Sequence, residues 1–132
     1  MILVDSSAWI EYHRATGSRA DARLMQAIET DEPLGTMGLV LLEVMSGARD
    51  ERHARDIRRL LARFEFFPLE EPSDPEAAAA LYRTCRRQGT TICRLPDCLI
   101  ATVAIRKQAE LLHQDSDFDA IARHAPLVMV AL

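Results

Sequence analysis

The stretch Leu95-Pro-Asp-Cys-Leu-Ile-Ala-Thr-Val-Ala-Ile105 predicts a helix that carries a carboxylate toward the core. Pro96 suits the first turn of a helix, where its missing N–H leaves no hydrogen bond unmade. Residues 90–95 before it are expected to form a loop. A charge that is partly buried has to be ion-paired, hydrogen-bonded or bound to a metal. Asp97 needs such a partner, because it begins an apolar helical stripe of Ile100, Ala101, Ala104 and Ile105.

Short apolar runs alternate with helical patterns along the rest of the chain. The run Ile2-Leu-Val4 is typical of a strand buried on both faces, and further strands are expected at 34–36, 65–69, 110–113 and 127–130. Helices are expected at 8–14, 19–29, 38–47, 50–63, 73–87, 96–108 and 118–123. The alternation predicts one α/β domain over residues 1–132, with a mainly parallel sheet of four to five strands between helices.

Two of the expected helices begin with capping signals. Ser6 and Ser7 follow the first strand and are expected to cap the helix after it. Ser73 and Glu76 match a capping box before an alanine-rich helix, with Asp74 as the alternative cap. Side chains are thus expected to satisfy the first N–H groups of both helices.

Composition places the chain among globular proteins of a reducing compartment. It is 48% hydrophobic and 27% charged, and it has no apolar run of the roughly 18 residues that a membrane span needs. The start lacks the positive region of a signal peptide, so a cytoplasmic location is expected. Cys85, Cys93 and Cys98 show no C-x-x-C pattern and are expected to be reduced thiols.

Charge is unevenly distributed, although the net charge of −4 does not by itself predict nucleic-acid binding. Residues 81–107 carry six basic side chains and one acid, and arginine, which binds phosphate through two parallel hydrogen bonds, makes up 15 of the 16 basic residues. Arg86, Arg87 and Arg94 are therefore candidates for contacts with a nucleic-acid backbone. The alternative is that they are ordinary solvated arginines.

Acidic residues fall where parallel-sheet proteins place functional sites, beyond the carboxyl ends of the strands. Asp5 ends the first strand, and an acidic loop over 114–119 follows the fourth. Glu43 is the one charged residue of the 38–47 helix and shares its apolar stripe. Taken alone, each acid could instead have an ordinary structural role, as a helix cap, a member of an ion pair or a solvated side chain in a loop. Together they predict a cluster with Asp97.

A divalent cation would make such a cluster stable, because carboxylates packed together raise each other's pKa. Mg²⁺ or Mn²⁺, one or two ions, prefers oxygen ligands and can activate water for attack on a phosphodiester. Ser7 is expected to hold a ligand or a metal-bound water in place. The expected metal ligands are Asp5, Glu43, Asp97, Asp115 and Asp117, of which all but Asp117 are also assigned to catalysis, and Asp119 is a weaker candidate.

Other catalytic signatures are missing from the sequence. It contains no phosphate-binding P-loop, no G-x-S-x-G nucleophile motif and no G-x-G-x-x-G motif, and its four histidines lack metal-site spacing. Trp9 and Tyr12 lie three residues apart on the first helix and are expected to pack in the core or at a subunit interface.

The acids lie in four short motifs, Ile2–Ile10, Val40–Gly47, Leu95–Ala101 and His113–Asp119. Taken in order, these motifs resemble those of PIN-domain nucleases, and most closely the VapC toxins of bacterial toxin–antitoxin pairs. The similarity covers the whole chain, and four weak motifs in this order and spacing form a strong pattern. Ser6 replaces the threonine that is commoner after the first acid, and keeps its hydroxyl.

The resemblance implies an α/β/α sandwich and a Mg²⁺- or Mn²⁺-dependent endoribonuclease. Such toxins cut structured RNA (tRNA, rRNA or mRNA) and so inhibit translation. The resemblance also implies a homodimer that is neutralised by a cognate VapB-type antitoxin covering the site.

Two other functions are compatible with the same fold. One is a non-catalytic adaptor that binds RNA or protein, although a protein without activity has no reason to keep all of the acids. The other is a DNA-directed nuclease, although 132 residues leave little room for the added elements that thread DNA.

Overall fold

A parallel four-stranded sheet lies at the centre of the computed structural model, which describes residues 1–90 and 93–132. The strand order is β3-β2-β1-β4, so β1 lies between two neighbours. This arrangement confirms the α/β class and the parallel sheet predicted from the sequence. The strands are β1 (Ile2–Val4), β2 (Leu34–Thr36), β3 (Glu65–Phe66) and β4 (Glu110–Leu112).

The predicted strand at 127–130 is wrong. This segment makes one isolated parallel bridge, between Leu111 and Met129, in which the Leu111 N–H donates to the Val128 carbonyl and the Leu111 carbonyl accepts the Val130 N–H. A strand needs consecutive pairs, and here pairing starts after Pro126, which cannot donate, while Val128 is 58% exposed. The apolar run therefore covers the edge of β4 without extending the sheet.

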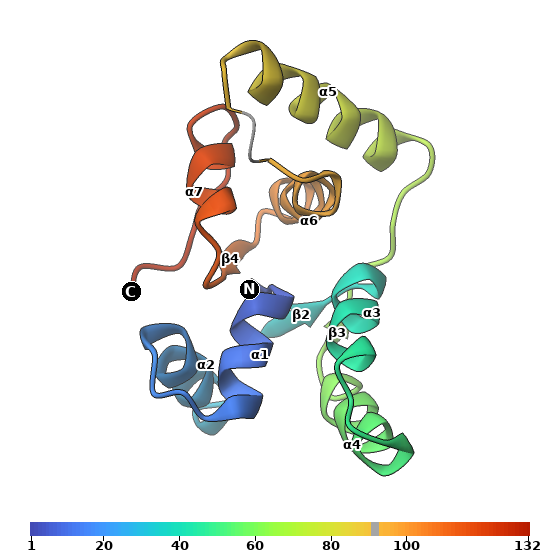
Figure 1. The fold of residues 1–132 in the computed structure, drawn as a ribbon, viewed down its shortest axis with the longest axis vertical. Coiled ribbons are helices and arrows are strands. Elements are labelled where there is room, and N and C mark those ends of the chain that lie inside the picture. Colours follow the sequence, from blue (N-terminus) through green and yellow to red (C-terminus); the bar gives the residue numbers. More distant parts are fainter. Residues whose placement is uncertain (91–92) are drawn as a thin grey trace.

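Helices cover both sides of the sheet. Figure 1 shows α1 and α2 on one side, α5, α6 and α7 on the other, and α3 and α4 beyond the β2–β3 edge. No helix in the two described ranges is long and apolar enough to cross a membrane. The helices are α1 (Ser6–Arg14), α2 (Arg19–Glu29), α3 (Gly38–Ser46), α4 (Glu51–Leu61), α5 (Ser73–Arg87), α6 (Leu95–Arg106) and α7 (Ser116–Ala122).

Both predicted caps are replaced by other interactions. Asp5 caps α1 by accepting a hydrogen bond from the Ser7 N–H, so Ser6 already lies inside the helix. At the start of α5 the cap position makes no side-chain hydrogen bond, and the Ser73 capping box does not form. The carboxylate of Asp74 turns instead to Arg106, because an ion pair with a guanidinium is a stronger interaction than a helix cap.

The predicted core positions of α6 are confirmed. Ile100, Ala101 and Ala104 are fully buried, and Ile105 is half-buried. Trp9 is also fully buried, packing 5.8 Å from the ring of Phe64. Its indole therefore belongs to the core of this chain and does not face a second subunit. Of the predicted loop at 90–95, residues 91 and 92 lie outside the described residues.

Candidate metal-binding active site

Because β1 pairs with β4, the residues that follow these two strands meet at the carboxyl ends of the strands, although they are far apart in the sequence. The strands run parallel, so their carboxyl ends lie side by side. Asp5 follows β1, and its N–H donates to the Leu112 carbonyl at the end of β4, at 2.9 Å. The acidic loop after β4 therefore starts beside Asp5, as the sequence predicted.

Three carboxylates form the centre of this region. Asp97, Asp115 and Asp117 each place one oxygen within 4.8 Å of the other two. Asp97 comes from the first turn of α6, Asp115 caps α7 and Asp117 lies in its first turn. The helix that begins near Pro96 thus directs Asp97 toward the strand ends, a placement that sequence periodicity could not establish.

Asp5 and Glu43 lie around this group but outside its 4.8 Å limit. Both influence it electrostatically. Burial raises the pKa of Glu43, and the nearby charge of Asp5 raises it further. Burial is also the main reason why the pKa of Asp5 is raised, with a smaller contribution from Asp115. All five predicted acids therefore share one electrostatic environment.

Two oxygens of the site are buried without a donor. Asp97 Oδ2 and Asp5 Oδ1 accept no hydrogen bond from any residue that the structure describes. The pKa of Asp97 is raised to about 7, mainly by burial and further by the charges of Asp115, Asp5 and Asp117. An unsatisfied buried carboxylate is costly. A cation bound there would remove that cost, and an all-oxygen set of ligands suits Mg²⁺ or Mn²⁺.

Hydroxyl groups hold the acids in place. Ser7 Oγ donates to Asp5 Oδ2 and accepts the Gln114 N–H at 2.9 Å. Ser6 Oγ donates to Glu43 Oε1 at 3.2 Å, a role that the sequence reasoning missed. Its position directly after the acid that ends β1 was the available signal. These bonds orient Asp5 and Glu43 before any ligand binds.

The loop after β4 is folded by its own polar groups. Asp115 Oδ1 accepts the Asp117 N–H at 2.9 Å, while the Asp115 N–H donates to His113 Nδ1 at 3.1 Å. Asp119, the weaker candidate, is not part of the three-carboxylate group. Its Oδ1 lies 3.8 Å from His113 Nε2 instead. The acidic loop thus divides into ligand candidates and a separate acid.

One of the three predicted backbone-binding arginines lies beside the site. Arg94 Nε is 3.4 Å from Asp117 Oδ2, and its side chain is 73% exposed. Arg86 lies over the ring of Tyr82, and Arg87 donates to Thr84. Arg94 is therefore placed to offer positive charge at the entrance to the carboxylates.

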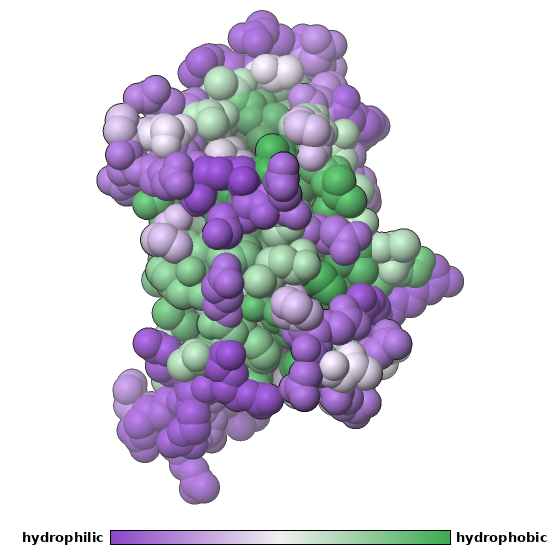
Figure 2. All heavy atoms as spheres, turned by 180° about the vertical axis from the view of Figure 1, so that it is seen from behind, coloured by the Kyte–Doolittle hydropathy of each residue, from purple (hydrophilic) through white to green (hydrophobic). Residues whose placement is uncertain are grey.

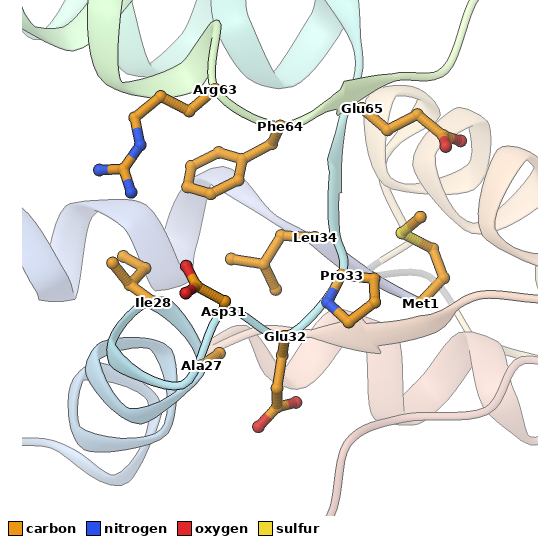
Figure 3. A pocket seen from close by; sticks show the side chains of 10 residues that line it. All are labelled: Met1, Ala27, Ile28, Asp31, Glu32, Pro33, Leu34, Arg63, Phe64 and Glu65. Atoms are coloured by element: carbon orange, nitrogen blue, oxygen red, sulfur yellow. The ribbon is translucent and has the colours of Figure 1, made fainter.

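The cavity in Figure 3 is separate from the carboxylates. It has a volume of about 330 Å³ and opens near the amino ends of the strands. The carboxylates lie beyond the opposite, carboxyl ends. Apolar side chains such as Leu34 and Phe64 line it, together with Arg63 and Asp31. None of the five predicted ligands contributes to its lining. The candidate site is thus the carboxylate cluster and not this cavity.

Comparison with known families agrees with this geometry. A family model described as "PIN domain" matches residues 2–124. The chain belongs to the PIN-domain family. Among its relatives, "VapC ribonuclease Mb1587" of Mycobacterium bovis and "Ribonuclease VapC11" of Mycobacterium tuberculosis are each 40% identical over 124 residues, covering 93% of this chain and 92% of theirs.

Solved structures share the PIN fold at low sequence identity. VapBC2 of Rickettsia felis, bound to a DNA fragment from its promoter, superposes with a TM-score of 0.75 at 16% identity, covering 98% of both chains. VapC20 of Mycobacterium tuberculosis, described as a toxin that cleaves the sarcin–ricin loop, gives 0.66 at 18%, covering 91% of this chain and 94% of its own. These matches support the fold.

Proposed function

We propose that this PIN domain is a VapC-like toxin, a Mg²⁺- or Mn²⁺-dependent endoribonuclease that cuts structured RNA. The observation that carries the proposal is the buried carboxylate cluster, in which Asp97 Oδ2 has no donor among the described residues. Asp21, a buried carboxylate on α2 outside this cluster, accepts the Gly17 N–H with one of its oxygens. The names of two relatives at 40% identity, both ribonucleases, support RNA as the substrate.

The proposed metal ligands are Asp97, Asp115 and Asp117, with Asp5 and Glu43 completing the site. Mg²⁺ or Mn²⁺ held there supplies water activation and charge neutralisation for hydrolysis of a phosphodiester. Ser7 fixes Asp5 Oδ2, while Asp5 Oδ1, which is buried without a donor among the described residues, would be available as a further ligand. The oxygens are thus held in position before substrate arrives.

Arg94 is proposed to contact the RNA backbone. With a net charge of −4 the chain has no general attraction for a polyanion, so positive charge has to be local. Arg94 is exposed and lies beside Asp117, where its guanidinium can exchange a carboxylate partner for a phosphate oxygen. The substrate is then drawn to the edge of the cluster.

A VapB-type antitoxin is the proposed protein partner. Leu42 precedes Glu43 on α3, and Leu95 precedes Pro96 at the start of α6; both leucines are 62% exposed. One face of the molecule shows a broad hydrophobic area between hydrophilic ends (Figure 2). Exposed apolar surface of this kind is typical of protein–protein contacts. An antitoxin segment covering the leucines would also block access to the acids.

We also propose a homodimer, as the resemblance to VapC toxins implies. Light scattering of the purified protein, alone and after co-expression with the product of an adjacent small reading frame, tests both assemblies. A monomer alone and an unbound partner after co-expression would contradict them.

The activity is tested by incubating purified protein with total RNA and with plasmid DNA, in Mg²⁺ or Mn²⁺ and in EDTA. We expect fragments from RNA only, and none in EDTA. Asp97→Asn should remove cleavage with the fold retained by circular dichroism. Asp31→Asn, the same chemical change in the cavity of Figure 3, is the matched control.

Each other outcome identifies a different function. Cleavage of plasmid but not RNA would make the protein a DNA-directed nuclease. Binding of RNA without cleavage in either metal would make it an adaptor. Full metal-dependent cleavage by folded Asp97→Asn would exclude the proposed role of the cluster.

A further inference from the structure

A second hollow adjoins the carboxylate cluster and is not explained by metal binding. Its volume is about 530 Å³, and Asp115 belongs both to its wall and to the three-carboxylate group. A group bound in the hollow would thus lie directly beside a bound metal ion. The rest of the wall combines polar groups with apolar side chains, chiefly His113, Gln114, Asp119, Met129, Val130 and Leu132.

The hydrogen bonds of His113 determine which ring nitrogen carries the proton. Nδ1 accepts the Asp115 N–H at 3.1 Å, so in the neutral ring the hydrogen lies on Nε2. Nε2 is 3.0 Å from Met129 Sδ, and a thioether sulfur is a weak acceptor. The hollow therefore contains an N–H donor whose present acceptor is easily replaced by an oxygen.

Asp119 places a carboxylate next to this donor. Its Oδ1 lies 3.8 Å from His113 Nε2, too far for a good hydrogen bond, and its side chain is 64% exposed. Asp119 lies outside the group of candidate metal ligands. Its oxygens are consequently available to a ligand in the hollow.

These groups favour a flat, neutral ligand with an acceptor beside its donors. Phosphate is disfavoured because Asp115 and Asp119 both carry negative charge. Met129 and Val130 offer apolar contact to the face of a ring. Nucleobases in single-stranded RNA are recognised in this way, by contact with the ring and hydrogen bonds along one edge.

Among the bases, guanine matches the wall best. Its O6 accepts one hydrogen bond, and the neighbouring N1–H and N2–H groups give a carboxylate two donors side by side. Adenine, cytosine and uracil each offer a carboxylate one donor group on the corresponding edge.

We propose that the hollow binds a guanine of the RNA next to the scissile phosphate, with His113 Nε2–H donating to O6 and Asp119 accepting from N1–H and N2–H. The inference rests on the proposed ribonuclease function and adds sequence preference to it. Asp119 is thereby a residue that determines specificity, separate from the metal ligands.

The test is cleavage of an RNA library with random sequence between fixed ends, with the cut positions mapped by sequencing. We expect guanine at one fixed position relative to the cut, favoured roughly tenfold or more over other bases. In Asp119→Asn the amide offers one acceptor oxygen, and the preference should fall to near unity. Asp31→Asn should keep the preference of the unchanged protein.

A second measurement does not depend on cleavage. Guanosine and adenosine are titrated separately into the unchanged full chain in EDTA, while the ring resonances of His113 are followed by NMR. We expect guanosine to shift them at lower concentration than adenosine, and Asp119→Asn to remove the difference.

The two experiments separate the possible failures. Guanosine binding without cleavage of any RNA would contradict the ribonuclease proposal and leave the base site standing. Cleavage with no fixed guanine, or an unchanged preference in Asp119→Asn, would overturn the base site alone. The base site would also be overturned if Asp119→Asn weakened the binding of a protein partner and left the base preference unchanged. The hollow would then be a contact with that protein.

Discussion

Two aspartates in the first turns of neighbouring helices are both buried, yet they differ completely in their partners. Asp74 on α5 is 2% exposed and Asp97 on α6 is 7% exposed. Asp74 accepts bonds from Arg106 Nε at 3.0 Å and Nη2 at 2.9 Å, and from the Glu70 N–H at 2.9 Å. Asp97 Oδ2 has no donor in the described part of the chain. The two aspartates are thus similar in burial and differ in hydrogen-bond donors: Asp74 has an arginine and a backbone N–H, and Asp97 Oδ2 has none among the described residues.

The largest expected effect comes from removing the charge of Asp97. Asp97→Asn should lower the rate of RNA cleavage roughly a thousandfold or more, because several kcal/mol of charge stabilisation by the metal are lost. Asp74→Asn, the same change at the paired aspartate, should keep most of the rate per folded molecule. Single-turnover cleavage at saturating Mg²⁺ measures both, and equal losses would remove the distinction between the two sites.

The two substitutions should affect the stability of the fold in the opposite order, with the larger loss for Asp74→Asn. Asp74→Asn leaves the half-buried Arg106 without its main partner and should cost roughly 3 kcal/mol, within the range for broken buried ion pairs. Asp97→Asn in EDTA should raise the melting temperature at pH 8, because it removes an unpaired buried charge. Denaturant and thermal unfolding in EDTA give both values. A melting temperature lowered by Asp97→Asn would show that its charge is already compensated.

The raised pKa of Asp97 predicts how stability and metal binding vary with pH. Because its pKa is about 7 in the folded protein against 3.8 ordinarily, the folded state holds the proton more tightly. The resulting stability is fully present below the ordinary pKa and is lost as pH rises toward 7. Metal has to displace this proton, so affinity for Mn²⁺ should fall roughly tenfold per pH unit below 7.

Calorimetric titration with Mn²⁺ between pH 5.5 and 8 checks the pH dependence of affinity. Asp97→Asn should show weaker binding with a flatter profile. An affinity that is independent of pH in the unchanged protein would contradict the assignment of the proton to this site.

The smallest expected effect concerns the hydroxyl that supports Asp5. Ser7→Ala removes the donor to Asp5 Oδ2 and the acceptor for the Gln114 N–H. Groups that orient metal ligands typically contribute 10- to 100-fold in affinity or activity, so a loss of roughly tenfold is expected. Ser7→Thr, which keeps the hydroxyl, should restore most of it. Mn²⁺ affinity and the cleavage rate should change together.

The contrast between the two aspartates also shows what the sequence could predict. The apolar stripe after Asp97 correctly predicted burial, and the order of strands and helices correctly predicted a parallel sheet. Whether α6 directs Asp97 toward the strand ends depends on how the helices pack against the sheet. The periodicity of apolar residues in the sequence carries no information about that packing. The role of Asp74 was mistaken for capping because its partner Arg106 lies 32 residues away.

Local patterns were misleading where distant residues decide the structure. The apolar run at 127–130 resembles a strand, but it meets β4 only at Leu111. Ser6 resembles a helix cap, while its hydroxyl in fact binds Glu43 on α3, 37 residues later. Both outcomes depend on the position of a partner far away in the sequence.

The hydrogen bond from Gln114 N to Ser7 Oγ joins residues that are 107 positions apart. During synthesis the amino-terminal part emerges first, and Asp5 has no β4 beside it until residues 110–112 have been made. A nascent chain that stops before Asp115 lacks two members of the three-carboxylate group. The carboxylate group therefore cannot form until the chain has been synthesised past Asp117.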